Sequence, residues 1–254
     1  MCLLLFAWRV RDDYPLVLAA NRDEFYARPS APADFWDDEP EILAGRDLQE
    51  GGTWLGITRS GRIAALTNYR DPTSFKANAP SRGGLVSGYL RGGADPESYL
   101  AGLVPDAGSY NGFNLLAGDR SGLFYFSNRG SQQKLEPGIY GISNSLLDVP
   151  WPKVVQGKKK LAEMLAGKAR PTPERLFRLL SDRTRPSDDQ LPDTGVGLEW
   201  ERVLSSLFIQ SPTYGTRSAT VIIVDKKGKT TFAERTFNEN GVPGMTTRTG
   251  FISV

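Results

Sequence analysis

The chain has one cysteine and no histidine, and together these facts restrict the chemistry that it can perform. The cysteine is Cys2, directly after the initiator methionine. Without histidine, the chain cannot form a Ser-His-Asp triad, a Cys-His pair or a histidine-ligated metal site. A nucleophilic Cys2 therefore needs another base. Removal of Met1 would supply one, because the exposed α-amino group has a reference pKa of about 7.7–8.0 and is partly neutral near pH 7.

The sequence around Cys2 also fits a simpler interpretation, in which this residue is a small apolar side chain that opens a strand. Cys2–Val10 and Pro15–Ala20 are apolar runs with a short polar break between them, the pattern of a β-hairpin. Antiparallel pairing returns the end of the second run to Cys2, and so brings Arg22 and Asp23 beside it. A guanidinium lowers the pKa of a thiol, and a carboxylate orients an amine. The alternative for this polar run is a surface ion cluster.

Two asparagines and a further arginine stand at the ends of apolar runs. Asn68 and Asn144 each end a predicted strand, and Arg217 precedes the predicted strand Ala219–Asp225. Side-chain amides are good donors to an oxyanion, each contributing roughly 2.7–4 kcal/mol when preorganised. Asparagine is also a common turn residue. Arg217 is either a second cationic clamp or an ordinary charge at a strand end.

The segment 50–56 is rich in glycine, but it lacks the Lys-Ser/Thr pair of a phosphate-binding loop and no helix follows it. We interpret it as a bulge or a tight approach between strands that lines a pocket, with Trp54 in its wall. The residues expected to contact a ligand are Asn21, Glu24, Trp54 and Tyr69.

Composition describes an ordinary globular protein. The 254 residues carry a net charge of +2, with 39% apolar and 24% charged residues, and the basic residues are scattered rather than gathered for nucleic acid. One cysteine excludes an internal disulfide framework, which is typical of a reducing compartment. No run approaches the ~20 apolar residues of a membrane span, and the opening run Met1–Trp8 is too short for a signal peptide. We expect a cytoplasmic protein without stable membrane insertion.

The order of predicted elements indicates two antiparallel sheets. Hairpins are expected in the first 70 residues, at 113–128 and at 219–237, with helices at 83–104 and 151–181, a short helix at 198–208 and a last strand at Met245–Val254. The polar, Pro-rich segment Asn21–Asp38 is expected to be a packed loop. Two antiparallel sheets packed face to face, with helices on their outer faces, satisfy this order. We therefore predict an α+β protein of four αββα layers, formed by a single domain over residues 1–254.

Several runs together resemble the NRDE family, also called the transport and Golgi organisation 2 family. Beside Met1-Cys2, the runs that carry the resemblance are Leu18–Pro29, Glu50–Ile57, Ala65–Tyr69, Tyr110–Leu115, Gly141–Ser145 with Pro150-Trp151, and Tyr214–Arg217. The resemblance runs nearly end to end.

The resemblance implies the N-terminal-nucleophile hydrolase fold and an arrangement like that of bile-salt hydrolase and penicillin V acylase. Those relatives use an N-terminal cysteine, an arginine and an aspartate on the second strand, two asparagines and a later arginine. The residues in that order here are Cys2, Arg22, Asp23, Asn68, Asn144 and Arg217. Arg22 and Asp23 are adjacent, whereas the relatives separate the two, and neighbours on a strand face opposite sides. One of them should therefore point away from Cys2, and Glu24 is a substitute for Asp23.

Two functions follow as hypotheses. In the first, the chain is a cysteine N-terminal-nucleophile amidohydrolase or acyltransferase that acts on a small acyl amide or thioester, with no metal or cofactor. In the second, the same cleft carries acyl-coenzyme A, a lipid or haem without turnover, in line with the haem and lipid handling that the resemblance implies. Haem would need Cys2, a tyrosine or a methionine as axial ligand, because histidine is absent. An interaction scaffold with a relic site is a third possibility.

Overall fold

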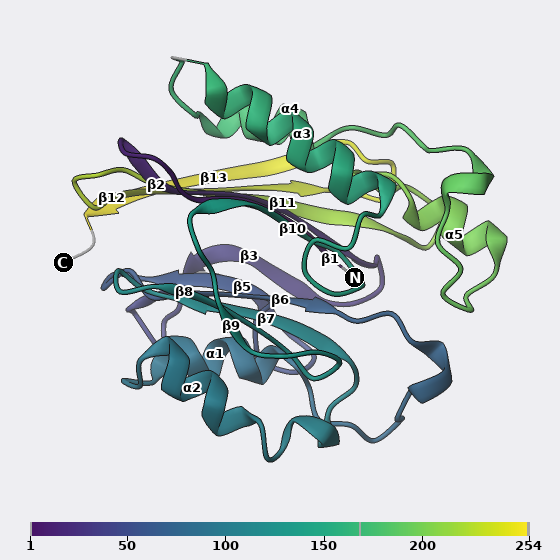
Figure 1. Ribbon diagram of the computed structural model, residues 1–254, viewed down its shortest axis with the longest axis horizontal. Helices are drawn as coiled ribbons and strands as arrows, with labels where there is room; N and C mark the ends of the chain where they lie inside the picture. The colour runs from purple at the N-terminus through teal and green to yellow at the C-terminus, as the bar shows by residue number, and fades with distance from the viewer. Residues whose placement is uncertain (1, 168, 253–254) are drawn as a thin grey trace.

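The computed structural model describes residues 2–167 and 169–252. Two antiparallel β-sheets are stacked face to face, and helices cover the outer face of each (Figure 1). This arrangement confirms the predicted four-layer αββα architecture. No helix among the described residues is long and apolar enough to cross a membrane.

The first sheet has six strands in the order β10-β1-β2-β11-β12-β13. Their bounds are β1 Cys2–Arg11, β2 Tyr14–Phe25, β10 Gly138–Ile142, β11 Tyr214–Val224, β12 Lys229–Phe237 and β13 Pro243–Ile252. The hairpin β1–β2 and the hairpin β11–β12 are those expected from the sequence. The last two residues of the strand predicted at Met245–Val254 lie outside the described residues.

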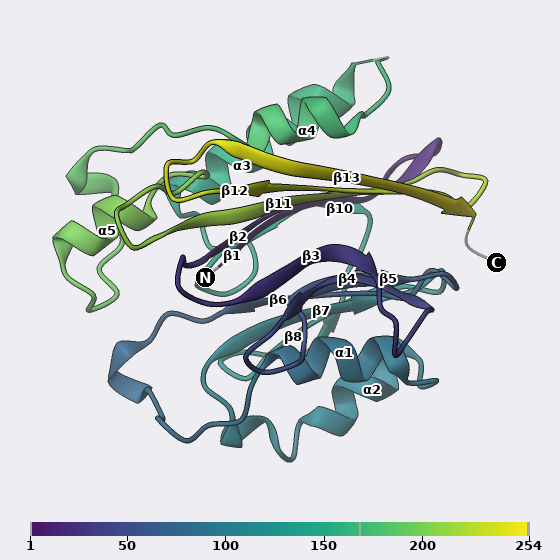
Figure 2. The same ribbon diagram turned by 180° about the vertical axis from the view of Figure 1, so that it is seen from behind.

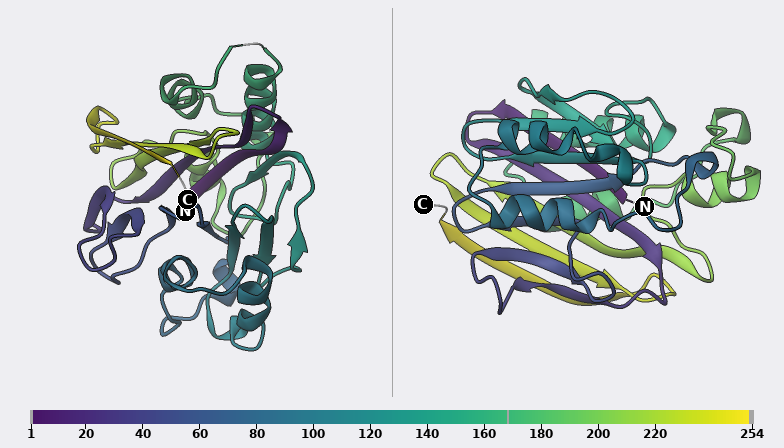
Figure 3. Two further views of the ribbon diagram at one scale, coloured as in Figure 1. Left: turned by 90° about the vertical axis from the view of Figure 1, so that its left-hand side faces the viewer. Right: turned by 90° about the horizontal axis from the view of Figure 1, so that it is seen from below.

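The second sheet has seven strands in sequential order, β3 to β9, so that every connection joins neighbours. Their bounds are β3 Ser30–Phe35, β4 Ile42–Asp47, β5 Leu55–Thr58, β6 Ile63–Asn68, β7 Phe113–Gly118, β8 Leu123–Ser127 and β9 Gln133–Lys134. Viewed from below, the strands of the two sheets cross obliquely (Figure 3).

Among the described residues, five α-helices form or extend the outer layers. They are α1 Gly83–Arg91, α2 Pro96–Leu103, α3 Pro152–Ala166, α4 Pro173–Leu180 and α5 Leu198–Leu204. Helices α1 and α2 cover the second sheet, α3 and α4 cover the first, and α5 lies beyond one end of the sheets (Figures 1 and 2). Two of these helices have side-chain caps: Asp95 accepts from the Ser98 amide before α2, and Thr172 accepts from the Arg175 amide before α4.

Strand β1 is buried on both faces, which explains its uninterrupted apolar sequence. Leu4, Phe6 and Trp8 pack between the sheets, whereas Leu3 and Leu5 pack under α3 and α4. By this alternation, Cys2 belongs to the face between the sheets. The strand that carries the candidate nucleophile is therefore held from both sides by the hydrophobic core.

The prediction of a packed loop over Asn21–Asp38 was wrong. Strand β2 continues through the polar residues to Phe25, and Ser30–Phe35 forms the edge strand β3. Asn21 and Asp23 are buried within β2, and each side chain has a hydrogen-bond partner. Polar side chains with such partners can be buried in a strand, so β2 does not end at these residues. Pro32 is accommodated because an edge strand has one row of amides that need no partner in the sheet.

Candidate active site around Cys2

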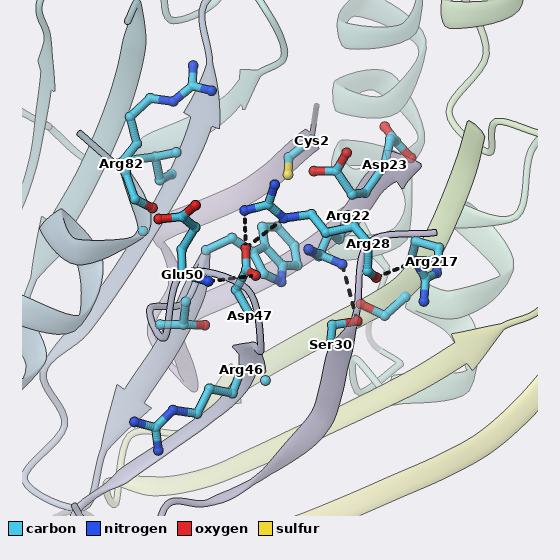
Figure 4. A pocket seen from close by; sticks show the side chains of 18 of the residues that line it. Cys2, Arg22, Asp23, Arg28, Ser30, Arg46, Asp47, Glu50, Arg82 and Arg217 are labelled. Atoms are coloured by element: carbon cyan, nitrogen blue, oxygen red, sulfur yellow. Dashed lines mark hydrogen bonds and ion pairs between the residues drawn. The ribbon is translucent and has the colours of Figure 1, made fainter. Parts of the chain in front are cut away.

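A pocket of about 300 Å³ opens between the two sheets at the start of β1. Its walls come from both sheets, from the turn after β4 and from the segment that precedes α1 (Figure 4). The predicted site residues that line it are Cys2, Arg22, Asp23, Glu24, Trp54, Asn68 and Arg217. Asn21, Tyr69 and Asn144 do not line it. The fold thus brings together residues that are more than 200 positions apart in the sequence.

Cys2 lies at the inner end of the pocket and is only 7% exposed. Burial raises the pKa of its thiol to about 11, although the nearby guanidinium of Arg22 opposes this rise. At neutral pH the thiol is therefore protonated, and its use as a nucleophile requires a base. Met1 lies outside the described residues, and its removal to expose the α-amine of Cys2 stays a prediction.

Arg22 is the residue that faces Cys2 directly. The antiparallel register of β1 and β2 places the two residues opposite each other, so that their side chains share the face between the sheets. Arg22 is 9% exposed, and its Nη1 lies 3.5 Å from Ser30 Oγ, a weak contact. No ion pair forms at Arg22 among the described residues. Its charge acts on the thiol and on the buried carboxyl of Glu234, which also lines the pocket.

Asp23 points to the opposite face of β2, towards the helix layer that covers the first sheet, yet it also lines the pocket. Its Oδ1 accepts a hydrogen bond of 2.7 Å from the Thr216 hydroxyl, and the Tyr214 hydroxyl donates to its backbone oxygen. Burial raises the pKa of this carboxyl to about 6. Glu24 lines the pocket as well, where its carboxylate accepts from the Phe25 amide.

Arg217 lies at a β-bulge of β11, because the pairing with β2 shifts between Thr216 and Ser218. Its Nη1 donates to the carbonyl oxygens of Phe25, Tyr26 and Arg28, at 2.9, 3.0 and 3.1 Å. These bonds fasten the turn that follows β2. Figure 4 shows Arg217 on one side of Cys2 and Arg82 on the other.

The two candidate asparagines, Asn68 and Asn144, are joined by a hydrogen bond. Asn68, at the end of β6, lines the pocket, whereas Asn144 is 1% exposed and lies outside the lining. Asn144 Nδ2 donates to the Asn68 carbonyl at 2.9 Å, and Arg70 Nη2 contacts Asn144 Oδ1 at 3.4 Å. Of the two, Asn68 has the position from which an amide can reach an oxyanion beside Cys2. Asn144 fixes the backbone of Asn68.

Three lining arginines carried no signal in the sequence. Two have carboxylate partners: Arg28 pairs with Asp47 at 2.7 Å and Arg46 with Asp38 at 2.6 Å. Arg82 Nη1 donates instead to the Gly112 carbonyl at 2.9 Å, and no carboxylate among the described residues lies within ion-pair distance of it. Burial lowers its pKa, and the field of Cys2 opposes this change. Each of these arginines stands in polar sequence, where an exposed position was the ordinary expectation.

Lys153 was also missed. It is the second residue of α3, it is 3% exposed, and its Nζ donates to the Leu204 carbonyl at 2.8 Å. The surrounding run, Pro150 to Lys153, shows a helix start but gives no sign that this lysine is buried. Sequence patterns indicate which face of a helix is apolar, and a lysine on such a face is normally assigned to solvent.

One expected contact has a structural role instead. Asn21 is buried on the helix side of β2, where its Nδ2 donates to the carbonyls of Leu180 and Leu207. It therefore joins α4 and the segment after α5 to the sheet. The glycine-rich segment makes a close approach to the start of α1 and not, as predicted, between strands: a Cβ on Gly52 would lie 2.6 Å from the carbonyl carbon of Gly83. This contact holds the start of α1, and with it Arg82, against the pocket.

Comparison with known proteins agrees with this geometry. Residues 1–239 match the family described as Transport and Golgi organisation 2. The chain belongs to that family. It is 42% identical over 257 residues to the transport and Golgi organization protein 2 homolog of Bos taurus, and 40% identical over 270 residues to that of Homo sapiens. The alignments cover 92% of both chains in the first comparison and 98% of both in the second.

The fold of this family member also resembles a solved hydrolase. The N-acylethanolamine-hydrolyzing acid amidase ortholog of Caenorhabditis elegans superposes with a TM-score of 0.52 at 13% identity, over 87% of this chain and 92% of that one. At this identity the likeness shows a shared N-terminal-nucleophile hydrolase fold.

Proposed function

We propose that the protein is a cysteine N-terminal-nucleophile hydrolase or acyltransferase that acts on a small acyl amide or thioester. The observation that carries the proposal is the position of Cys2, the only cysteine, at the inner end of a pocket with Arg22 opposite it and Asn68 in the wall. The fold shared with an amidase adds support. The residues to which we assign the reaction are Cys2, Arg22, Asp23, Asn68, Asn144 and Arg217.

The reaction follows from the chemistry of these groups. After removal of Met1, the α-amine of Cys2 takes the thiol proton as the sulfur attacks the carbonyl carbon. The carbonyl oxygen becomes an oxyanion, to which the Asn68 amide donates. Collapse of the tetrahedral intermediate breaks the C–N or C–S bond, and the α-ammonium returns its proton to the leaving amine or thiol. The acyl group remains on Cys2 as a thioester, and water or a second nucleophile then releases it.

The four other assigned residues support the reaction without forming bonds to the substrate. They are Arg22, Asp23, Asn144 and Arg217. Arg22 favours the thiolate by its charge, and Asp23 holds the amine formed at the chain start. Asn144 fixes Asn68, and Arg217 holds the turn beside the pocket. Among the described residues, no three cysteine or carboxylate side chains gather as metal ligands, and the proposed reaction uses none.

The first experiment is the intact mass of the untagged protein before and after treatment with iodoacetamide at pH 7. We expect a mass without Met1 and a single acetamide adduct, lost in Cys2→Ala. Wild-type protein is then screened against acyl amides and acyl thioesters, with Cys2→Ala as the matched control. Turnover that persists unchanged in Cys2→Ala would show that Cys2 is not the nucleophile. Retention of Met1 would remove the base that this mechanism needs.

The alternative is a carrier, and one observation favours it: the rise of the Cys2 pKa to about 11 is typical of an inert buried thiol. Acyl-coenzyme A would then bind through its phosphates to Arg22 and Arg82. Binding that survives Cys2→Ala without release of free coenzyme A would support this function over the enzyme. For haem, the described lining residues include neither tyrosine nor methionine, so Cys2 would be the axial ligand and Cys2→Ala would shift the Soret band.

A further inference from the structure

Lys153 occupies a position that helix stability does not explain. It lies in the first turn of α3, after Trp151 at the N-cap and Pro152 at the first helical position. The positive end of the helix dipole disfavours an ammonium there. The side chain is nonetheless 3% exposed, and lysine is almost never fully buried unless it is paired. An explanation for this buried charge therefore has to come from its neighbours.

The charged and titratable groups that act on Lys153 come from four different segments of the chain. They are Cys2 of β1, Asp23 of β2, Arg70 after β6 and Glu201 of α5. Arg70 and Glu201 already form an ion pair of 2.6 Å with each other, and Thr194 also donates to Glu201 through its amide and its hydroxyl. The two groups left to interact with the ammonium at longer range are Asp23 and Cys2.

Asp23 lies in the same layer as this ammonium. It is on the helix-covered face of β2 and is 1% exposed, and the charges of Asp23 and Lys153 act on each other. Its negative charge disfavours a thiolate at Cys2, and burial also disfavours it. An ionised Asp23 would therefore suppress the nucleophile that it helps to orient unless a positive charge offsets it. In a buried site with a low effective dielectric, a nearby ammonium provides that charge.

We propose that Lys153 is a positioning residue, whose buried ammonium offsets the charge of Asp23 so that Asp23 stays ionised without suppressing the Cys2 thiolate. The inference rests on the proposed nucleophilic role of Cys2, and it assigns to Lys153 no contact with substrate. Burial lowers the pKa of Lys153 to about 8, while Asp23 raises it, and the ammonium form is therefore the larger fraction at neutral pH. The Leu204 carbonyl holds the ammonium in place.

The test is the pH dependence of the rate at which iodoacetamide alkylates Cys2, which needs no substrate. In Lys153→Met we expect the midpoint of the profile to rise by about one pH unit, which corresponds to about tenfold less thiolate at lower pH. Lys159→Met changes an exposed lysine of the same helix and should leave the midpoint unchanged. In the double variant Lys153→Met/Asp23→Asn, the midpoint should return close to that of the wild type, because the charge to be offset is gone.

Lys153→Arg provides a second measurement that does not depend on a neutral side chain folding in this place. It keeps the positive charge, and we expect a midpoint at or below that of the wild type. A folded Lys153→Met with the wild-type midpoint would overturn the proposal, as would a Lys153→Arg midpoint that rises. A double variant shifted as far as Lys153→Met would show that Asp23 is not the intermediary. If wild-type Cys2 resists alkylation at every pH, the proposed nucleophile itself fails, an outcome distinct from these.

Discussion

At the scale of single residues, burial keeps the Cys2 thiol protonated. Burial also strengthens the electrostatic interactions of the charged side chains beside it, Arg22 and Asp23. The register of β1 and β2 answers the question raised by the adjacency of Arg22 and Asp23. Arg22 shares the inner face with Cys2, and Asp23 lies on the helix face. The two residues therefore act on Cys2 from different layers. Only Asp23 is near Lys153 and Thr216, which tune its charge.

Asp23→Asn should change how stability depends on pH. Burial raises the pKa of Asp23 from near 3.8 to about 6, so the folded state holds the proton more tightly than the unfolded state. The contribution of Asp23 to stability is greatest below pH 4 and is lost as the pH rises through 6, by on the order of 3 kcal/mol. Relative to the wild type, Asp23→Asn should gain stability between pH 4.5 and pH 7.5, measured as the free energy of unfolding in urea. A difference that is constant with pH would contradict this.

At the scale of elements, the sequence predicts best those strands that are buried on both faces. The apolar run of β1 and the hairpins around it were predictable, because a strand covered on both faces has a continuous apolar pattern. Strand β3 was not, since its proline and its charged residue resemble a loop and only an edge position tolerates them. The same limit applies to the site. Cys2 and Asn68 stand at strand ends, and Arg22 follows closely on the apolar run of β2, so the pattern locates all three. Arg82 and Lys153, in contrast, enter through packing between distant segments.

The segment after β6 is joined to α5 by a buried ion pair whose loss should be costly. The side chains of Arg70 and Glu201 are 5% and 4% exposed, and they meet at 2.6 Å. Glu201→Gln leaves the Arg70 guanidinium buried without a counter-charge, and we expect a loss of about 3–5 kcal/mol in the free energy of unfolding. The neighbouring Arg202 pairs with Asp188 at the surface, so Arg202→Gln should remain close to the wild type. Urea unfolding of the two variants measures both effects, and equal losses would contradict the assignment.

At the scale of the whole molecule, the pocket exists only because the two sheets are stacked. Cys2 and Arg22 come from the first sheet, Asn68 comes from the second, and Arg82 precedes the helix that covers the second. No single hairpin contains the candidate site, which explains why adjacency in the sequence could not reveal it. An occupant of the pocket must therefore contact both halves of the sandwich.

This dependence leads to a prediction about binding. A short-chain acyl-coenzyme A added to Cys2→Ala, which cannot be acylated at that position, should slow amide hydrogen exchange in both sheets together, near residues 20–24 of β2 and 66–68 of β6. It should also raise the melting temperature with ligand concentration, because binding to the folded state alone stabilises it by mass action. The rise should be smaller in Cys2→Ala/Arg82→Met, which removes a cation of the pocket wall while leaving the ion pair of Arg28 with Asp47 intact. Protection confined to one sheet would place the ligand on an outer surface and not between the layers.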